Sequence, residues 1–247
     1  MPPTYGMYEV YGNVHGVNIC KVPLNENYQI DLENLESSIK PNTKIIWICS
    51  PNNPTANSID RSSIEMVLNN FDGLVVVDEA YINFSRQKSF LADLDEYPNL
   101  VVLQTLSKAW GLAGLRIGMA FASKEIVSIM NKVKAPYNIS EPVQELALKA
   151  LDEVGQVNDM IKEIIVLRDQ LVKELKNVEQ VVKIYPSDTN FLLVKFKSSK
   201  HLYDYLLQKG IVVRDRSNVR FCEGCLRITV GTQKENEALL NAIKSFQ

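Results

Sequence analysis

The sequence has no long apolar run and little net charge. Its apolar runs stay well below the roughly 18 residues that a membrane-spanning helix needs, and the first residues show no basic region followed by an apolar one. The net charge of −2 at pH 7 gives no electrostatic reason to expect binding to nucleic acid or to an anionic membrane. These absences favour a soluble, cytoplasmic protein.

Cysteine and histidine are also scarce. Cys222 and Cys225 have the spacing of metal ligands, but a zinc site needs a second pair, and Cys20 and Cys49 lie 29 residues apart. The two histidines have no acidic or cysteine pattern beside them. We therefore expect no metal site, and we expect the cysteines to stay reduced, as in other cytosolic proteins.

Length and pattern predict a large α/β domain in the first part of the chain. With 247 residues, 46% of them apolar, the chain can bury a sizeable core. Strands alternate with helices, which predicts a mostly parallel sheet flanked by helices. A helix between the second and third strands has Ser62 and Glu65 in capping-box spacing. The expected strands are residues 17–22, 44–49, 74–78, 100–106 and 115–122.

From about residue 141 the pattern changes to helices and short strands. Residues 143–151 and 157–175 have the periodicity of amphipathic helices. Further helices are expected near 200–209 and at the C-terminus, and further strands at 181–185, 190–196, 211–214 and 226–230. These elements predict a smaller α+β domain. The chain would then consist of a large domain, residues 1–140, and a small C-terminal domain, residues 141–247.

A single lysine follows the expected strand 100–106, in the sequence Thr105-Leu106-Ser107-Lys108. Burial favours the neutral amine of a lysine, which makes it a nucleophile toward carbonyl groups. The hydroxyls, the nearby glycines and Arg116 suit a phosphate, because guanidinium binds its oxygens bidentately. A phosphorylated aldehyde held on a lysine is pyridoxal 5'-phosphate (PLP). The alternative is an ordinary strand end with a solvated lysine.

Two earlier strands also end in polar residues. An aspartate such as Asp78, at the carboxyl end of a buried strand, can pair with a protonated pyridine nitrogen, and Tyr81 can hydrogen-bond a phenolic oxygen. After strand 44–49, two prolines fix a turn that directs Asn53. Each feature alone could be a helix cap, a surface tyrosine or an ordinary turn. The three clusters together favour a cofactor site.

These clusters resemble the fold-type-I PLP-dependent aminotransferases, and within them the histidinol-phosphate aminotransferases. The resemblance implies that the chain is a homodimeric enzyme moving an amino group between histidinol phosphate and 2-oxoglutarate, with glutamate as the other amino acid, in histidine biosynthesis. An aromatic-amino-acid aminotransferase, a phosphothreonine decarboxylase and a non-catalytic dimerising fragment remain as alternatives. The matching segments are Pro3–Tyr8, Ser50–Thr55, Val77–Tyr81, Thr105–Lys108 and Gly224–Thr232.

The resemblance implies roles for individual residues in cofactor binding. Lys108 would hold PLP as a Schiff base and move a proton at the substrate's α-carbon, while Asp78 would face the ring nitrogen. Tyr5 would stack on the ring. The remaining cofactor contacts would be Asn53 and Tyr81 at the phenolic oxygen, and Thr105, Ser107 and Arg116 at the phosphate.

Two arginines near the C-terminus would bind the substrate, again by resemblance. Arg227 would take an anionic group, and Arg214 would be a second anion contact. From the residues alone, Arg227 could equally be a strand arginine that faces solvent. The run Arg214-Asp215-Arg216 could equally be a charged stretch of surface.

The chain departs from the family pattern in two places. Ala56 stands where the family usually has glycine, and a left-handed backbone there would cost on the order of 1 kcal/mol. Family chains also begin well upstream of Pro3–Tyr8. The resemblance therefore implies that an N-terminal segment, with a glycine-containing loop at the cofactor phosphate, is missing from this sequence.

Overall fold

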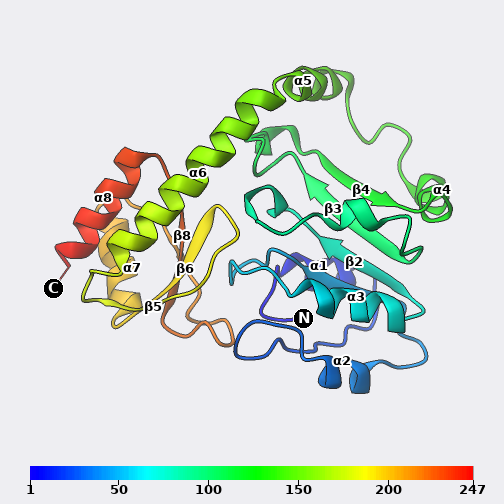
Figure 1. Ribbon diagram of the computed structural model, residues 1–247, viewed down its shortest axis with the longest axis horizontal. Coiled ribbons are helices and arrows are strands. Elements are labelled where there is room, and N and C mark those ends of the chain that lie inside the picture. The colour runs from blue at the N-terminus through cyan, green and yellow to red at the C-terminus, as the bar shows by residue number, and fades with distance from the viewer. Residues whose placement is uncertain (247) are drawn as a thin grey trace.

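The computed structural model describes residues 1–246, which contain two four-stranded sheets (Figure 1). In the first sheet the strand order is β1-β2-β3-β4. Strands β1 to β3 pair in parallel, and β4 is antiparallel to β3. The prediction of a mostly parallel sheet with helices is therefore confirmed. The strands are β1 Ile45–Cys49, β2 Leu74–Asp78, β3 Leu100–Thr105 and β4 Gly118–Ala122.

The two faces of this sheet have different neighbours. Side chains alternate along a strand, so Ile48 and Val77 share one face, where they pack with Ile64 of helix α3, Arg61–Asn70. Trp47 lies on the opposite face and stacks on Tyr8 of helix α1, Met7–Val14. The sheet thus buries an apolar face against α3 and presents its other face to α1.

The remaining elements of the first half surround the sheet. Helix α4 begins at Ser123, whose side chain accepts from the backbone N–H of Ile126 as an N-cap. Helix α5 has a proline in its first turn, where a missing N–H costs nothing. These elements are α2 Leu32–Ser38, α4 Lys124–Val133, α5 Glu141–Asp152, and the 3-10 turns Ile82–Phe84, Phe90–Asp93 and Ala113–Leu115.

The second sheet is antiparallel, with the order β5-β6-β8-β7. Helix α6, Val154–Leu175, runs diagonally from α5 to this sheet (Figure 1). Helix α8, Gln233–Lys244, begins with a capping box between Thr232 and Glu235. The other elements are β5 Val181–Ile184, β6 Phe191–Phe196, α7 Ser199–Gln208, β7 Arg214–Asp215 and β8 Cys225–Thr229.

The two sheets share part of one core. Leu193 of β6, together with Cys222 and Cys225, belongs to the same buried cluster as Ile48 and Val77 of the first sheet. Burying apolar surface contributes about 25 cal/mol per Å², so this shared cluster resists separation of the sheets. The two-domain division at residue 140 stays a prediction.

Three details of the predicted elements are wrong. Residues 17–22 form no strand, because a strand needs a paired neighbour, and among residues 1–246 no strand pairs with the outer edge of β1. Residues 115–117 precede β4, since Arg116 follows a 3-10 turn with a left-handed φ of 56°. Residues 211–213 lie outside the two-residue strand β7.

The capping box predicted for α3 is also wrong. The N-cap residue is Asp60, whose side chain makes no capping hydrogen bond. Ser62 lies inside the helix, and the Glu65 carboxylate instead accepts from Nε of Arg61 at 2.8 Å. The i,i+4 ion pair therefore takes the place of the expected cap.

Candidate active site

The parallel strands end at one edge of the first sheet, and the predicted residues gather there. Register pairs Cys49 with Asp78 and Asp78 with Leu103, so the carboxyl ends of β1, β2 and β3 are level. Arg227 of β8 reaches this edge from the second sheet, where its Nη1 donates to Oδ1 of Asn53 at 2.6 Å. The site therefore lies where the two sheets meet.

The carboxylate of Asp78 is held by two hydrogen bonds. Its Oδ1 accepts from the backbone N–H of Ala80 at 3.0 Å, and its Oδ2 accepts from the hydroxyl of Tyr8 at 2.5 Å. Burial raises the pKa of Asp78, whereas the two hydrogen bonds and the charge of Lys108 lower it. Burial is the largest of these effects, so the pKa of Asp78 is raised overall, and the two hydrogen bonds limit that rise.

Lys108 is an exposed residue whose amine is nevertheless partly desolvated. Its Nζ lies 5.3 Å from the ring centroid of Tyr81. Desolvation lowers the pKa of Lys108, and the positive charges of Arg227 and Arg116 lower it further, while Asp78 raises it. Partial loss of water and neighbouring cations therefore favour the neutral amine.

Tyr81 is buried beside this lysine. Its ring meets Phe191 edge-on, with centroids 5.2 Å apart, and Arg227 lies 4.8 Å above the same Phe191 ring. Burial raises the pKa of Tyr81 to about 12, against the lowering effect of Arg227. Its hydroxyl therefore stays protonated near neutral pH and can donate a hydrogen bond.

The hydroxyls after β3 lie together. The Thr105 hydroxyl is 2.9 Å from Oγ of Ser107 and 3.0 Å from the carbonyl of Ile117, and it accepts from the Ser107 backbone N–H at 3.0 Å. Arg116 is exposed, and its Nη1 donates to the carbonyl of Ala113 at 3.0 Å. The structure brings Thr105 and Ser107 into contact but gives Arg116 no hydrogen bond to either.

The second sheet adds positive charge without matching negative charge. Arg214 of β7 is exposed and lies opposite Arg227 in the strand register. Nε of Arg227 and Nε of Arg216 are buried without a hydrogen-bond partner among the described residues. Within residues 1–246, neither Lys108 nor Arg116 nor these three arginines forms an ion pair with a carboxylate. The orphaned donors and uncompensated charge fit an anionic ligand.

The turn after β1 fixes the N-terminal segment to the site. The side chain of Asn52 donates to the carbonyl of Pro3 at 2.8 Å and accepts from Oγ1 of Thr4 at 3.0 Å. This places Tyr5, which is 45% exposed, edge-on to Tyr8 at 5.5 Å. In the same turn Ala56 has a φ of 71°, so the left-handed strain expected of an alanine there is present.

Three residues of the site were missed from the sequence. Tyr8 bonds to Asp78, Phe191 carries the ring contacts of Tyr81 and Arg227, and Arg216 has an orphaned buried donor. The spacing of three between Tyr5 and Tyr8 was a usable signal, because it places two aromatic rings on neighbouring positions of a helix start. No local sequence pattern around Phe191 or Arg216 indicated that these residues belong to the site.

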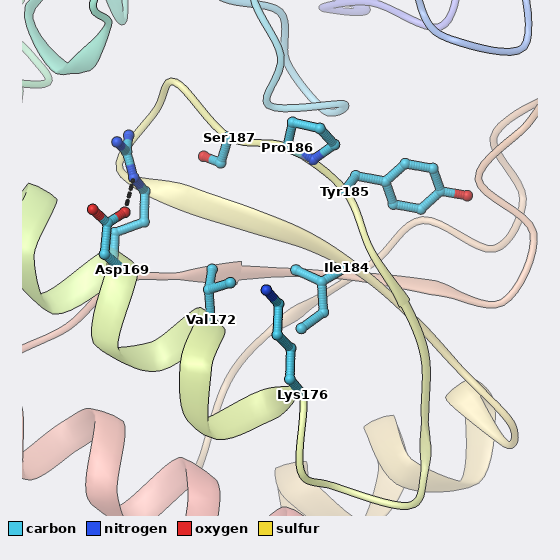
Figure 2. Close-up of a pocket in the computed structure, with 8 residues that line it drawn as sticks. Asp169, Val172, Lys176, Ile184, Tyr185, Pro186 and Ser187 are labelled. Carbon is cyan, nitrogen blue, oxygen red and sulfur yellow. Dashed lines mark ion pairs between the residues drawn. The ribbon is translucent and has the colours of Figure 1, made fainter.

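A cavity lies apart from these residues. It has a volume of about 280 Å³ and lies between α6 and the segment after β5, with Lys176 and Ser187 in its wall (Figure 2). Arg168 at its edge is buried and donates to the carbonyls of Phe84 and Thr189 at 3.3 and 2.9 Å. This arginine therefore ties α6 to both halves of the chain.

The described residues offer neither a metal centre nor a membrane segment. Between residues 1 and 246, no three His, Cys, Asp or Glu side chains gather as metal ligands. In the same range, no helix combines the length and apolar character needed to cross a bilayer.

The sequence matches the family model described as "Aminotransferase class I and II" over residues 1–243. The chain belongs to the class I and II aminotransferases. This aminotransferase is 50% identical over 246 residues to a histidinol-phosphate aminotransferase of Cytophaga hutchinsonii, a match that covers 100% of the chain and 71% of the relative. The resemblance inferred from the sequence motifs is thereby confirmed.

Solved structures of other proteins share the fold. The aminotransferase matches the histidinol-phosphate aminotransferase of Clostridium acetobutylicum with a TM-score of 0.91 at 25% identity, covering 98% of this chain and 75% of that one. It matches the L-threonine-O-3-phosphate decarboxylase of Porphyromonas gingivalis with a TM-score of 0.84 at 27% identity, covering 99% and 75%. The predicted fold class is confirmed.

The lowered pKa of Lys108 predicts unusual reactivity in the aminotransferase. Lys108 should react with an amine-acylating reagent at a lower pH than the exposed Lys40, because more of its amine is neutral. Removing a positive neighbour in Arg227→Gln should raise the pKa of Lys108 and move its reaction to higher pH. Competitive labelling with peptide mass analysis measures both lysines in one sample. Equal pH profiles for Lys108 and Lys40 would contradict the prediction.

Proposed function

We propose that this aminotransferase uses PLP to move an amino group between histidinol phosphate and 2-oxoglutarate, in histidine biosynthesis. The observation that carries the proposal is the meeting of Lys108 and Asp78 at one sheet edge with arginines that lack a carboxylate partner among the described residues. The histidinol-phosphate aminotransferases among the relatives support the choice of substrate.

The residues of this site fit PLP as a ligand. An amine with a lowered pKa, a carboxylate and paired hydroxyls match the aldehyde, the ring nitrogen and the phosphate of the cofactor. When bound, PLP supplies an aldehyde that condenses reversibly with amines and a ring that withdraws electrons. We assign its contacts to Tyr5, Asn53, Asp78, Tyr81, Thr105, Ser107, Lys108 and Arg116.

Three of these residues would act in the reaction itself. Lys108, with its lowered pKa, can accept a proton from the substrate's α-carbon and return it, which is general acid–base catalysis. The charge of Asp78 would stabilise a protonated ring nitrogen. The hydroxyl of Tyr81, which stays protonated because its pKa is raised, would donate to the phenolic oxygen of the ring.

Two arginines would bind the anionic groups of the substrates. Arg227 lies next to Asn53, and its buried Nε has no hydrogen-bond partner among residues 1–246, so it can take a carboxylate at the centre of the site. Arg214 faces it across the β7–β8 pair and is exposed, which suits a phosphate farther out. Guanidinium groups bind both anions bidentately.

We also propose that the chain forms a homodimer and acts in the cytoplasm. Exposed apolar side chains on and beside α4 and α5 support a second copy as the partner, including Val133 at 82% and Tyr137 at 95% exposure. The four cysteines form no disulfide with one another, which suits a reducing compartment.

The proposed function is tested by the first half of the reaction, in which one equivalent of amino donor transfers its amino group to PLP. The PLP-loaded chain should convert histidinol phosphate to its keto product and leave pyridoxamine phosphate, detected by mass spectrometry. Lys108→Ala is the matched control and should leave PLP unchanged. Release of carbon dioxide from O-phosphothreonine, without this half-reaction, would instead support a decarboxylase, the activity named for one structural neighbour.

The proposed role of Arg214 predicts a change in specificity. Arg214→Ala should slow the half-reaction with histidinol phosphate at least tenfold and the one with glutamate less than threefold, because a charge-assisted bond to phosphate contributes about 1.5–3 kcal/mol. Arg220→Ala is the control, since this exposed arginine packs over Phe221. Equal losses with both amino donors would mark Arg214 as structural.

A further inference from the structure

Tyr8 is the one side chain in the described residues that donates a side-chain hydrogen bond to Asp78. It lies in the first turn of α1 and stacks on Trp47, with centroids 5.1 Å apart and planes 28° apart. Strand alternation and the β1–β2 register put Trp47 and Asp78 on the same face of the sheet. The ring of Tyr8 is therefore seated on β1 while its hydroxyl reaches the end of β2.

The contact fixes both oxygens of the carboxylate. Oδ2 accepts from the Tyr8 hydroxyl at 2.5 Å, and Oδ1 accepts from the Ala80 backbone N–H at 3.0 Å. Each carboxylate oxygen has two lone pairs, so each keeps one acceptor position free for a ligand. The carboxylate is thereby oriented without being blocked.

A phenol suits this position better than a cation would. An arginine or lysine would neutralise the carboxylate, whereas a neutral hydroxyl stabilises the ionised form and leaves its full charge for a cationic ligand atom. Burial, Cys49 and Asp78 raise the pKa of Tyr8 far above its usual range, so the hydroxyl stays a donor.

We propose that Tyr8 is a positioning residue, whose hydroxyl favours the carboxylate form of Asp78 and orients it toward the ring nitrogen of a bound pyridine cofactor. The inference rests on the proposed function in one respect, the pairing of Asp78 with that nitrogen. In this role Tyr8 affects the cofactor only through the Asp78 carboxylate. The neighbouring Tyr5, by contrast, has no hydrogen bond to this carboxylate.

Loss of the Tyr8 hydroxyl should change the pH dependence of cofactor binding. The Tyr8 hydrogen bond lowers the pKa of Asp78, so its removal raises that pKa, and the ionised carboxylate is then lost at a higher pH as the solution is acidified. Cofactor affinity should decline with it. The other titratable groups that face Asp78 are Cys49 on β1, Tyr81 after β2 and Lys108 after β3.

The test uses Tyr8→Phe, which removes one oxygen and keeps the ring on Trp47. Two probes are titrated into the chain and followed by tryptophan fluorescence: PLP itself, and the deaza analogue with carbon in place of the ring nitrogen. Tyr8→Phe should weaken PLP binding about tenfold, the loss expected for one charge-assisted hydrogen bond, and analogue binding less than twofold. The acid limb of PLP binding should move to higher pH, because the pKa of Asp78 rises when the Tyr8 hydrogen bond is removed.

Two further variants complete the design. Tyr11→Phe changes a 60% exposed tyrosine on the same helix and should behave as the unmodified chain. In an Asp78→Asn background, Tyr8→Phe should cause no further loss of PLP affinity, because the group it acts through is gone.

Other results with Tyr8→Phe would contradict the proposed role of Tyr8. Equal losses for PLP and the analogue would make Tyr8 merely structural, and no loss for either would remove it from the site. Both results would leave the proposed function intact. If the unmodified chain fails to bind PLP in a Lys108-dependent way, the proposed function fails and this inference fails with it.

Discussion

The parallel pairing of β1, β2 and β3 is the constraint on which the rest of the site depends. Parallel strands in register end at the same edge, so Asn53, Asp78 and Lys108 become neighbours although they are far apart in the sequence. The apolar strand residues provide the stability, and the candidate site residues lie at the end of a strand or a few residues beyond it. A change of register by one residue would turn Asp78 to the opposite face of the sheet.

Charge is the second feature that organises the site. Two sheets bring a lysine and several arginines toward one carboxylate, and burial together with their mutual repulsion lowers the pKa values of Lys108 and Arg227. Such an arrangement costs stability until an anion binds, so the binding energy of a phosphate or carboxylate is partly the relief of this repulsion. Burial raises the pKa of Asp78, and the hydrogen bonds from Tyr8 and the Ala80 N–H limit that rise. If these arginines bind the substrate as proposed, anion binding and the pKa of Lys108 are coupled through Arg227.

The sequence predicted what depends on local pattern. Apolar runs in the sequence predicted the strands of the first sheet. The polar residues at the boundaries of these runs predicted the candidate site residues Asn53, Asp78 and Lys108. Predictions that depend on distant partners were less successful. Residues 17–22 have strand composition but no neighbour to pair with, and the Tyr8–Asp78 bond joins residues 70 positions apart. The effect of Arg227 on the pKa of Lys108 also joins residues from the two sheets, which no local pattern encodes. The assigned roles of the site residues remain predictions.

The central claim is that the ends of these strands build a site in which Lys108 holds PLP. The most direct measurement is borohydride reduction of the PLP-loaded chain, followed by proteolysis and peptide mass analysis. The account predicts a pyridoxyl label on Lys108, absent when Lys108→Arg is treated in the same way. A label on another lysine, with Lys108 unmodified, would contradict the account.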